Sequence, residues 1–337
     1  MSRKISRSFI NGRTGAGTAG QGLKVEWDST NDGELHWKDV SESSLEYVVP
    51  WVFQGSNYGF TSGGFNGSSS LNEIDKFSLS SNVTAADHGN LTVAKRVNAA
   101  SSSSTDGFAS GGEGGENVID KFSFTSSSGA SDHGDLSVNK RQPTGQSSST
   151  DGYTAGANDN NFQNVIDKFA YTSNTTAADW GDLTNTQGSG AGQSSSTDGY
   201  CSGGYRGGYS TTAVIEKFSF SSSSGSATHG NLSVARYGVQ GQSSTDYGFS
   251  SGGGDAVTDV IDKFAFSSNT TASDHGDLAI VTTQAAGISA TDYGYSAGGY
   301  TSSEVNTINK FAYSSNTTAS DHGDLQGAKR MIGGSQY

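Results

Sequence analysis

The chain has 337 residues, a formal net charge of −13 and only 31% hydrophobic residues, with 48 Gly, two Pro and one Cys. A single Cys excludes an internal disulfide framework and a zinc site built on several cysteines. The acidic balance argues against nucleic acid as a partner, because Lys and Arg side chains that neutralise phosphates supply most non-specific affinity. No apolar run approaches the roughly 20 residues of a membrane helix, so we expect no membrane insertion.

Residues 1–46 form an N-terminal segment that differs from the rest of the chain. Its start is basic, with Arg3, Lys4, Arg7 and Arg13 beside Gly-rich sequence. No apolar run follows these cations, so the segment does not match a secretory signal peptide, and we expect synthesis in the cytoplasm. Two interpretations of the basic start remain open: a flexible tail, or an arm that orders on a partner.

A small β-hairpin is expected later in this segment. Residues 23–27 and 34–37 alternate apolar and polar side chains and include Trp27 and Trp37. Between them lies the sequence Asn-Asp-Gly at residues 31–33, which is typical of a tight turn between two strands.

From residue 47 to the end, one block recurs six times. It contains Gly-aromatic-x-small-Gly-Gly, then Ile-Asp-Lys-Phe, then Asp-His-Gly-Asp-Leu, with variations. A period of 45 to 49 residues is typical of arrays, solenoids and propellers. A segment that is merely solvated has no reason to repeat in this way, so the periodicity overrides the composition, which by itself would indicate disorder. The Phe of the block falls at Phe77, Phe122, Phe169, Phe218, Phe264 and Phe311.

Each unit divides into four short strands separated by turn residues. In the third unit the expected strands cover residues 144–150, 152–156, 165–171 and 178–183, with a variable loop after residue 156. Val165, Asp167 and Phe169 share one face of the third strand, while Ile166 and Lys168 share the other. Neither face is purely polar, so both faces are expected to be covered. Radially stacked sheets cover both faces of every blade, which predicts an all-β fold, a six-bladed β-propeller.

Two segments could supply the first strand of the first blade and so close the ring. Residues 51–56 fit this role, and residues 330–335 fit it as well. We favour residues 51–56, which makes the first blade continuous in sequence. The C-terminal segment would then cover an edge strand that could otherwise pair with another chain.

One aromatic position with ring nitrogen recurs in every unit. Because Trp180 fills the same position as five His residues, and Trp cannot ligate a metal, the position indicates a flat ring whose N–H contacts a neighbour. We therefore expect no metal site. The position is occupied by His88, His133, Trp180, His229, His275 and His322.

The repeated acid of the third strand is interpreted as structural. Adjacent residues on a strand point to opposite faces, so Asp75 cannot pair with its neighbour Lys76. General acid–base catalysis needs one or two specially placed carboxylates, and sixfold repetition argues against it. Cys201 replaces a small residue of the second strand and is expected to be buried. We expect no enzyme, no catalytic residues and no cofactor.

The loops between the second and third strands are the best candidates for a binding site, because they differ in every unit. Equivalent loops of a propeller emerge on one face, and aromatic residues among hydrogen-bonding groups suit glycans or protein partners. The alternative is that these loops vary because nothing constrains them. The candidate residues are Phe65, Phe162, Tyr205, Arg206, Tyr209 and Tyr300.

Gly-Gly after an aromatic and two small residues, as in residues 60–64, 200–204 and 295–299, resembles the kelch repeat. A basic residue before the next unit adds to the resemblance, at Arg96, Arg141, Arg236 and Arg330, although the third and fifth units lack it. Kelch repeats carry an apolar run before Gly-Gly, which small polar residues replace here. This Ser-, Gly- and Asp-rich variant is similar to propeller repeats in structural proteins of marine tailed bacteriophages, especially those that infect cyanobacteria.

The resemblance implies a non-enzymatic virion component, either a tail fibre, a tail-associated protein or a capsid-decorating protein. Residues 1–46 would attach to other virion proteins through Arg3, Lys4, Arg7, Arg13, Trp27 and Trp37. Residues 47–337 would form the propeller and contact host-surface glycan or protein. The expected location is the extracellular virion, after synthesis in the host cytoplasm. The alternative is a free glycan-binding propeller that belongs to no virion.

Overall fold

The computed structural model describes residues 21–23, 37–39, 53–114, 117–159, 161–254 and 258–337. The chain divides into two units, residues 1–50 and residues 51–337. In the first unit, β1 (Gln21–Leu23) pairs antiparallel with β2 (Trp37–Asp39), with Leu23 opposite Trp37. These strands overlap the expected hairpin strands only at their ends. The expected Asn-Asp-Gly turn lies outside the described residues, as do Arg3, Lys4, Arg7, Arg13 and Trp27.

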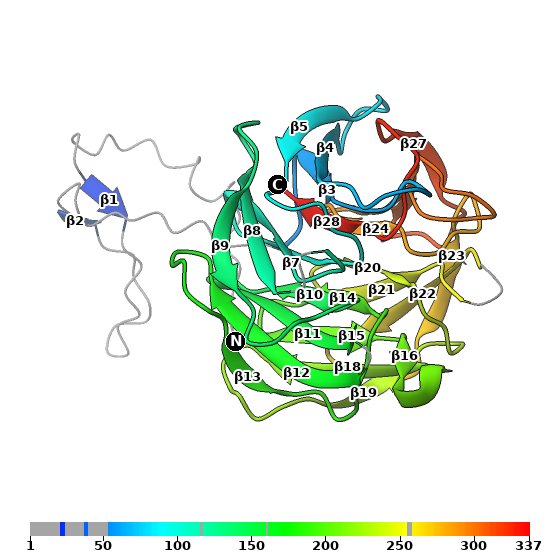
Figure 1. Ribbon diagram of the computed structural model, residues 1–337. Coiled ribbons are helices and arrows are strands. Elements are labelled where there is room, and N and C mark those ends of the chain that lie inside the picture. Colours follow the sequence, from blue (N-terminus) through cyan, green and yellow to red (C-terminus); the bar gives the residue numbers. More distant parts are fainter. Residues whose placement is uncertain (1–20, 24–36, 40–52, 115–116, 160, 255–257) are drawn as a thin grey trace. The chain divides into compact units, whose positions relative to one another are not determined.

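The second unit consists of six four-stranded antiparallel sheets, and it confirms the expected six-bladed β-propeller (Figure 1). Blade 1 contains β28 (Gly333–Gln336), β3 (Tyr58–Ser62), β4 (Glu73–Ser78) and β5 (Ala86–Asn90). Blade 2 contains β6 (Ala99–Ser102), β7 (Asp106–Ser110), β8 (Val118–Ser123) and β9 (Ser131–Asp135). Blade 3 contains β10 (Thr144–Ser147), β11 (Asp151–Asp159), β12 (Asn161–Ala170) and β13 (Ala178–Asp182).

The remaining blades follow the same order from the axis outward. Blade 4 contains β14 (Ala191–Ser194), β15 (Asp198–Ser202), β18 (Val214–Ser219) and β19 (Ala227–Asn231). Blade 5 contains β20 (Gln240–Ser243), β21 (Tyr247–Ser251), β22 (Val260–Ala265) and β23 (Ser273–Asp277). Blade 6 contains β24 (Ala286–Ser289), β25 (Tyr293–Ala297), β26 (Thr307–Ala312) and β27 (Ser320–Asp324). Within the described ranges, no helix is long and apolar enough to cross a bilayer.

Two loops between second and third strands have structure of their own. In blade 3 the strands extend into the expected loop, so β11 and β12 form a long hairpin with Asn158 opposite Phe162. In blade 4 the insertion folds into β16 (Tyr205–Arg206), a 3-10 helix at Gly207–Tyr209, and β17 (Ser210–Thr211). These two insertions are adjacent around the ring.

The ring is closed by the C-terminal strand. β28 pairs with β3, with Gly333 opposite Ser62 and Gln336 opposite Gly59, and Figure 1 shows the red C-terminal strand beside blue β3. The expectation that residues 51–56 form this strand is therefore wrong. The reason is steric, because innermost strands approach so closely that this position carries Gly in five blades and Ala100 in blade 2, and a Cβ at Gly334 would overlap the carbonyl of Gly287. In the other blades this position lies eight residues before the aromatic residue of the second strand, as Gly192 does before Tyr200. If residues 51–56 formed the innermost strand of blade 1, Val52 would occupy this position, eight residues before Phe60.

Residues 53–57 run instead across one end of the propeller axis. The Gln54 side-chain amide donates to the carbonyl of Ser243 in blade 5 at 3.1 Å, and the Gly55 amide donates to Ser289 in blade 6 at 2.8 Å. The backbone amides of residues 56–58 all donate to the carbonyl of Tyr337. Residues 53–57 thus fasten together blades 5, 6 and 1, where the two ends of the propeller chain meet.

Aromatic packing between blades forms the core. Phe60 on the second strand of blade 1 contacts Phe122 on the third strand of blade 2 and Phe124 just after that strand, with ring centroids 5.8 and 4.9 Å apart. The same arrangement recurs around the ring, and both faces of the third strands are covered, as expected. All six repeated Phe residues are buried: Phe77, Phe122, Phe169, Phe218, Phe264 and Phe311.

The Gly before each second-strand aromatic residue is required by this packing. A Cβ at Gly199 would lie 2.7 Å from Cε1 of Phe218, which lies across the strand from it. The equivalent Gly residues of the other five blades lie under their own Phe rings in the same way. The Gly-aromatic dipeptide in the repeat is therefore a packing requirement.

We predict that Gly199→Ala destabilises the propeller by about 1–3 kcal/mol, because the added methyl group overpacks a full core. The free energy of unfolding, measured by chemical denaturation, checks this. Gly327→Ala is the matched control, since a Cβ there meets no atom within 4 Å. Equal stability of the Gly199 and Gly327 variants would contradict the packing argument.

Candidate functional site

The propeller has two different faces. One face, here called the loop face, carries the second-to-third-strand loops and the connections from each outer strand to the next blade. Connections and loops form antiparallel backbone bridges there. Arg96 and Gly188, which lie in connections, pair with Glu113 and Tyr205, which lie in loops. The opposite face, here called the turn face, carries the hairpin turns, and residues 53–57 cross the axis there.

The repeated acid of the third strand forms a buried ion pair with the preceding connection. Lys95 contacts Asp120 at 2.8 Å, and both side chains are buried. Each basic residue comes from the connection leaving one blade, and each acid belongs to the next blade, so the pair joins neighbours. Equivalent pairs are Lys140–Asp167, Arg236–Asp262 and Lys329–Asp75.

This register corrects the alignment of basic residues made from sequence. Arg236 occupies the buried position of Lys95, whereas Arg96, Arg141 and Arg330 lie one residue later and are partly exposed. Adjacent Lys-Arg residues at the end of a unit allow either alignment. Only the side-chain partner distinguishes them.

Two blades lack the basic residue, and each compensates differently. In blade 6 the acid is replaced by Asn309 and the connection carries Thr282, so no buried charge needs a partner. In blade 4 the connection carries Gln187 at the position that Lys95 holds in blade 2. The buried Glu216 pairs instead with Arg206 at 3.4 Å. An unpaired buried carboxylate would be costly. Arg206, a predicted ligand-binding residue, is thus engaged by Glu216.

The repeated His or Trp also joins neighbouring blades. His133 Nε2 donates to the carbonyl of Ala170 at 2.9 Å, and Trp180 Nε1 donates to Ser219 at 2.9 Å. The four other His residues make the same contact. This agrees with the interpretation of the position as an aromatic ring with an N–H. Among the described residues, no group of three His, Cys, Asp or Glu side chains converges as a metal site would require.

Cys201 lies in the interface between blades 3 and 4. Its side chain is buried, and Sγ lies 3.1 Å from Oγ1 of Thr144. Burial raises the pKa of the Cys201 thiol to about 12. Because the thiolate is the nucleophilic form, this environment suits packing and not covalent catalysis.

Four aromatic side chains form one cluster on the loop face, here called the tyrosine cluster. Phe162 contacts Tyr209 with ring centroids 5.2 Å apart, and Tyr209 contacts Tyr205 at 5.7 Å. Tyr205 stacks on Tyr237 at 4.0 Å. The structure therefore brings together three of the predicted residues from the insertions of blades 3 and 4. The sequence analysis missed Tyr237, which lies in a connection and not in a variable loop.

The other predicted aromatic residues lie in a second group across blades 6, 1 and 2, here called the arginine cluster. The Arg330 guanidinium lies 4.4 Å from the Tyr300 ring centroid and 5.5 Å from that of Phe65. Arg96 lies over Phe65 at 4.6 Å. Glu113 accepts from Arg96 at 2.6 Å and Arg141 at 2.5 Å. Arg330 pairs with Glu304 at 3.3 Å, so three Arg and two Glu side chains give the arginine cluster a net charge of +1.

Between these clusters lies the mouth of the propeller axis, which the sequence did not reveal. Six residues with φ between 53° and 63° surround it. Each donates its backbone N–H to the carbonyl of the previous one, beginning with Gln142 to Val97 at 3.2 Å and closing with Val97 to Met331 at 2.8 Å. The ring consists of Val97, Gln142, Ser189, Gly238, Gln284 and Met331.

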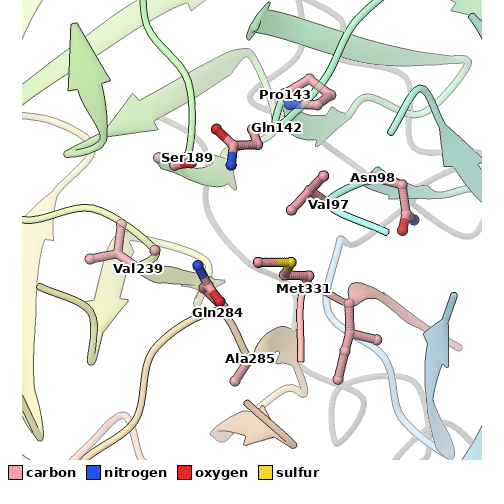
Figure 2. A pocket seen from close by; sticks show the side chains of 12 residues that line it. Val97, Asn98, Gln142, Pro143, Ser189, Val239, Gln284, Ala285 and Met331 are labelled. Carbon is pink, nitrogen blue, oxygen red and sulfur yellow. The ribbon is translucent and has the colours of Figure 1, made fainter. Parts of the chain in front are cut away.

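This closed ring stabilises a backbone conformation that is costly for residues other than Gly. The mouth is a cavity of about 100 Å³, and Figure 2 shows the Gln142, Gln284 and Met331 side chains around it. Because the six ring positions differ in residue type, no sequence signal marks them. The cavity holds only a few waters, so we assign ligand contacts to the wider clusters around it.

No protein-family model matches this chain, and none of the curated proteins is similar to it.

His275 and His322 predict a pH-dependent stability. Burial lowers the pKa of His275 and His322 below the usual 6.5, against the opposing effect of their hydrogen bonds to backbone carbonyls. The unfolded chain then binds more protons than the folded chain just below this pH, so stability falls as pH drops from about 7.5 to about 5.5.

We predict that His275→Trp with His322→Trp reduces this pH-dependent loss, because Trp180 shows that the position accepts an uncharged ring. Thermal denaturation of both proteins across this pH range measures the difference. The same pH-dependent loss in the variant would assign the effect to other groups.

Proposed function

We propose that this chain is a non-enzymatic binding and display protein whose loop face contacts glycan or protein on a cell surface. The observation that carries the proposal is the tyrosine cluster. The Tyr209 side chain is 63% exposed, yet Phe162 and Tyr205 contact its ring and fix its orientation. An exposed aromatic ring held in place loses little conformational entropy when it binds a partner.

The titratable groups support a non-enzymatic role. The buried acids recur around the ring and are engaged by Lys95, Lys140, Arg236 and Lys329 or by Arg206. The ring nitrogens of the repeated His residues contact backbone carbonyls. These groups hold blades together, and catalysis would require a pair set apart from the repeat.

The proposed setting is a tailed-phage particle, as a tail fibre, a tail-associated protein or a capsid-decorating protein. The resemblance to propeller repeats of phage structural proteins supports this setting. Residues 53–57, where the chain enters the propeller, lie at the axis on the turn face. Residues 1–46 would attach to other virion proteins. The alternative is a free glycan-binding propeller, and the tyrosine cluster is equally compatible with it.

We predict that Phe162→Ala with Tyr209→Ala weakens binding to cyanobacterial cells by at least about tenfold, as expected for removal of exposed aromatic anchors. Flow cytometry with the fluorescently labelled full-length protein measures binding. Val83→Ala removes an exposed apolar side chain of a hairpin turn on the turn face, 53% exposed, and serves as the control. Unchanged binding by the double variant, with both proteins folded, would remove the loop face as the site.

The virion setting predicts a separate effect of the N-terminal cations. Replacing Arg3, Lys4, Arg7 and Arg13 by Ala in the full-length protein should abolish cosedimentation with phage particles that lack this protein, while cell binding remains. Electrostatic attachment also weakens as salt rises, which gives a second measurement. Cell binding without any particle binding by the unmodified protein would favour the free glycan-binding alternative.

A further inference from the structure

A second candidate site lies on the turn face, in the groove between blades 5 and 6. It is a cavity of about 400 Å³ whose sides include Tyr247 and Tyr293. These two side chains are 38% and 39% exposed. Lys263, Asp246 and Asp292 also line the groove, together with Ser and Thr hydroxyl groups of the hairpin turns.

The residue that starts each second strand falls into two classes around the ring. Blades 5, 6 and 1 carry Tyr247, Tyr293 and Tyr58, whereas blades 2, 3 and 4 carry Asp106, Asp151 and Asp198. The third-strand Lys contacts either type. Lys263 lies 4.1 Å from the Tyr247 ring centroid, and Lys121 lies 3.3 Å from an oxygen of Asp106.

The groove between blades 2 and 3 is therefore a natural counterpart of the groove between blades 5 and 6. It is a cavity of about 490 Å³ with an equivalent Lys, but it carries Asp106 and Asp151 in place of the two Tyr residues, and Thr105 and Thr150 in place of Asp246 and Asp292. Three blades are built with Asp at this position, so the fold does not require Tyr there. Packing within a blade therefore does not explain why Tyr247 and Tyr293 are aromatic and half-exposed, and we look for a ligand that would contact them.

The chemistry of the groove favours an uncharged ligand that has both apolar faces and many hydroxyl groups. The Tyr247 and Tyr293 rings can pack against the C–H faces of a sugar ring. The Asp246 and Asp292 carboxylates can accept hydrogen bonds from its hydroxyls, and these charges disfavour anionic ligands. A volume of about 400 Å³ lies in the range of small-ligand sites and accommodates one or a few sugar units.

We propose that the groove between blades 5 and 6 binds a neutral saccharide through Tyr247 and Tyr293. This site lies on the face opposite the tyrosine cluster and is independent of the proposed loop-face function. It gives the propeller two binding surfaces that separate substitutions can remove one at a time.

The test uses the full-length protein with three neutral probes, maltohexaose, cellohexaose and mannohexaose. Saturation-transfer NMR and titration measure binding of each. The variant Tyr247→Asp with Tyr293→Asp introduces the residues that blades 2 and 3 carry, and Lys263 can then pair as Lys121 does with Asp106. We expect this variant to keep its thermal stability and to lose at least about tenfold in affinity for the probe that binds.

A reciprocal variant tests whether the rings and the carboxylates together are sufficient. Asp106→Tyr and Asp151→Tyr, combined with Thr105→Asp and Thr150→Asp, give the groove between blades 2 and 3 the same rings and acids, and we expect a second equivalent of the saccharide to bind. Absence of binding by all three probes would overturn the proposal. Unchanged binding after the Tyr-to-Asp substitutions would also overturn it. Loss of saccharide binding only in the Phe162 and Tyr209 variant would place that binding on the loop face instead.

Discussion

Each blade is held mainly by the contacts that it makes with its neighbours, because a four-stranded sheet rich in Gly and Ser cannot bury either of its faces alone. Aromatic rings of one blade fill the space over the third strand of the next, as Phe60 does against Phe122 and Phe124. A buried ion pair such as Lys95–Asp120 and a His-to-carbonyl bond such as His133–Ala170 cross the same interfaces. Hence a blade removed from the ring would expose its core and its buried charges together.

Near the axis the interfaces become polar and narrow. The Ser102 amide donates to Oγ of Ser147, and the Ser147 amide donates to Oγ of Ser194, at 2.9 and 3.0 Å. The series continues through Ser243, Ser289 and Gln336 and returns to Ser102. Together with the backbone ring at the loop-face mouth, it gives the axis two closed sets of hydrogen bonds. Small side chains in the innermost strands are thus needed both for close approach and for these bonds.

Differences among the six blades separate structural positions from positions open to function. Where the basic residue is missing, its partner changes too, as in Thr282 with Asn309, or another cation replaces it, as Arg206 does for Glu216. Such coupled changes indicate structural positions. The exposed aromatic residues behave differently. Tyr209 has no counterpart in the other blades. Tyr247 occupies a position at which three blades carry Asp, so the fold accepts either residue there. Binding is therefore assigned to these aromatic residues.

The sequence by itself determined the number of blades, the four strands of each and the coverage of both faces of the third strand, because a fixed period and alternating side chains depend on local chain geometry. It also placed Phe162, Tyr205 and Tyr209 among the candidate site residues. Only the tertiary structure decided that β28 closes the ring, that Arg236 shares its position with Lys95, and that Tyr237 joins the cluster. These features depend on contacts between residues 14 to 277 apart in the sequence, at blade interfaces or where the ring closes, such as Arg236 with Ser250 and Gly59 with Gln336. Steric fit and charge pairing at those interfaces have no local signature, so the pattern along the chain could not reveal them.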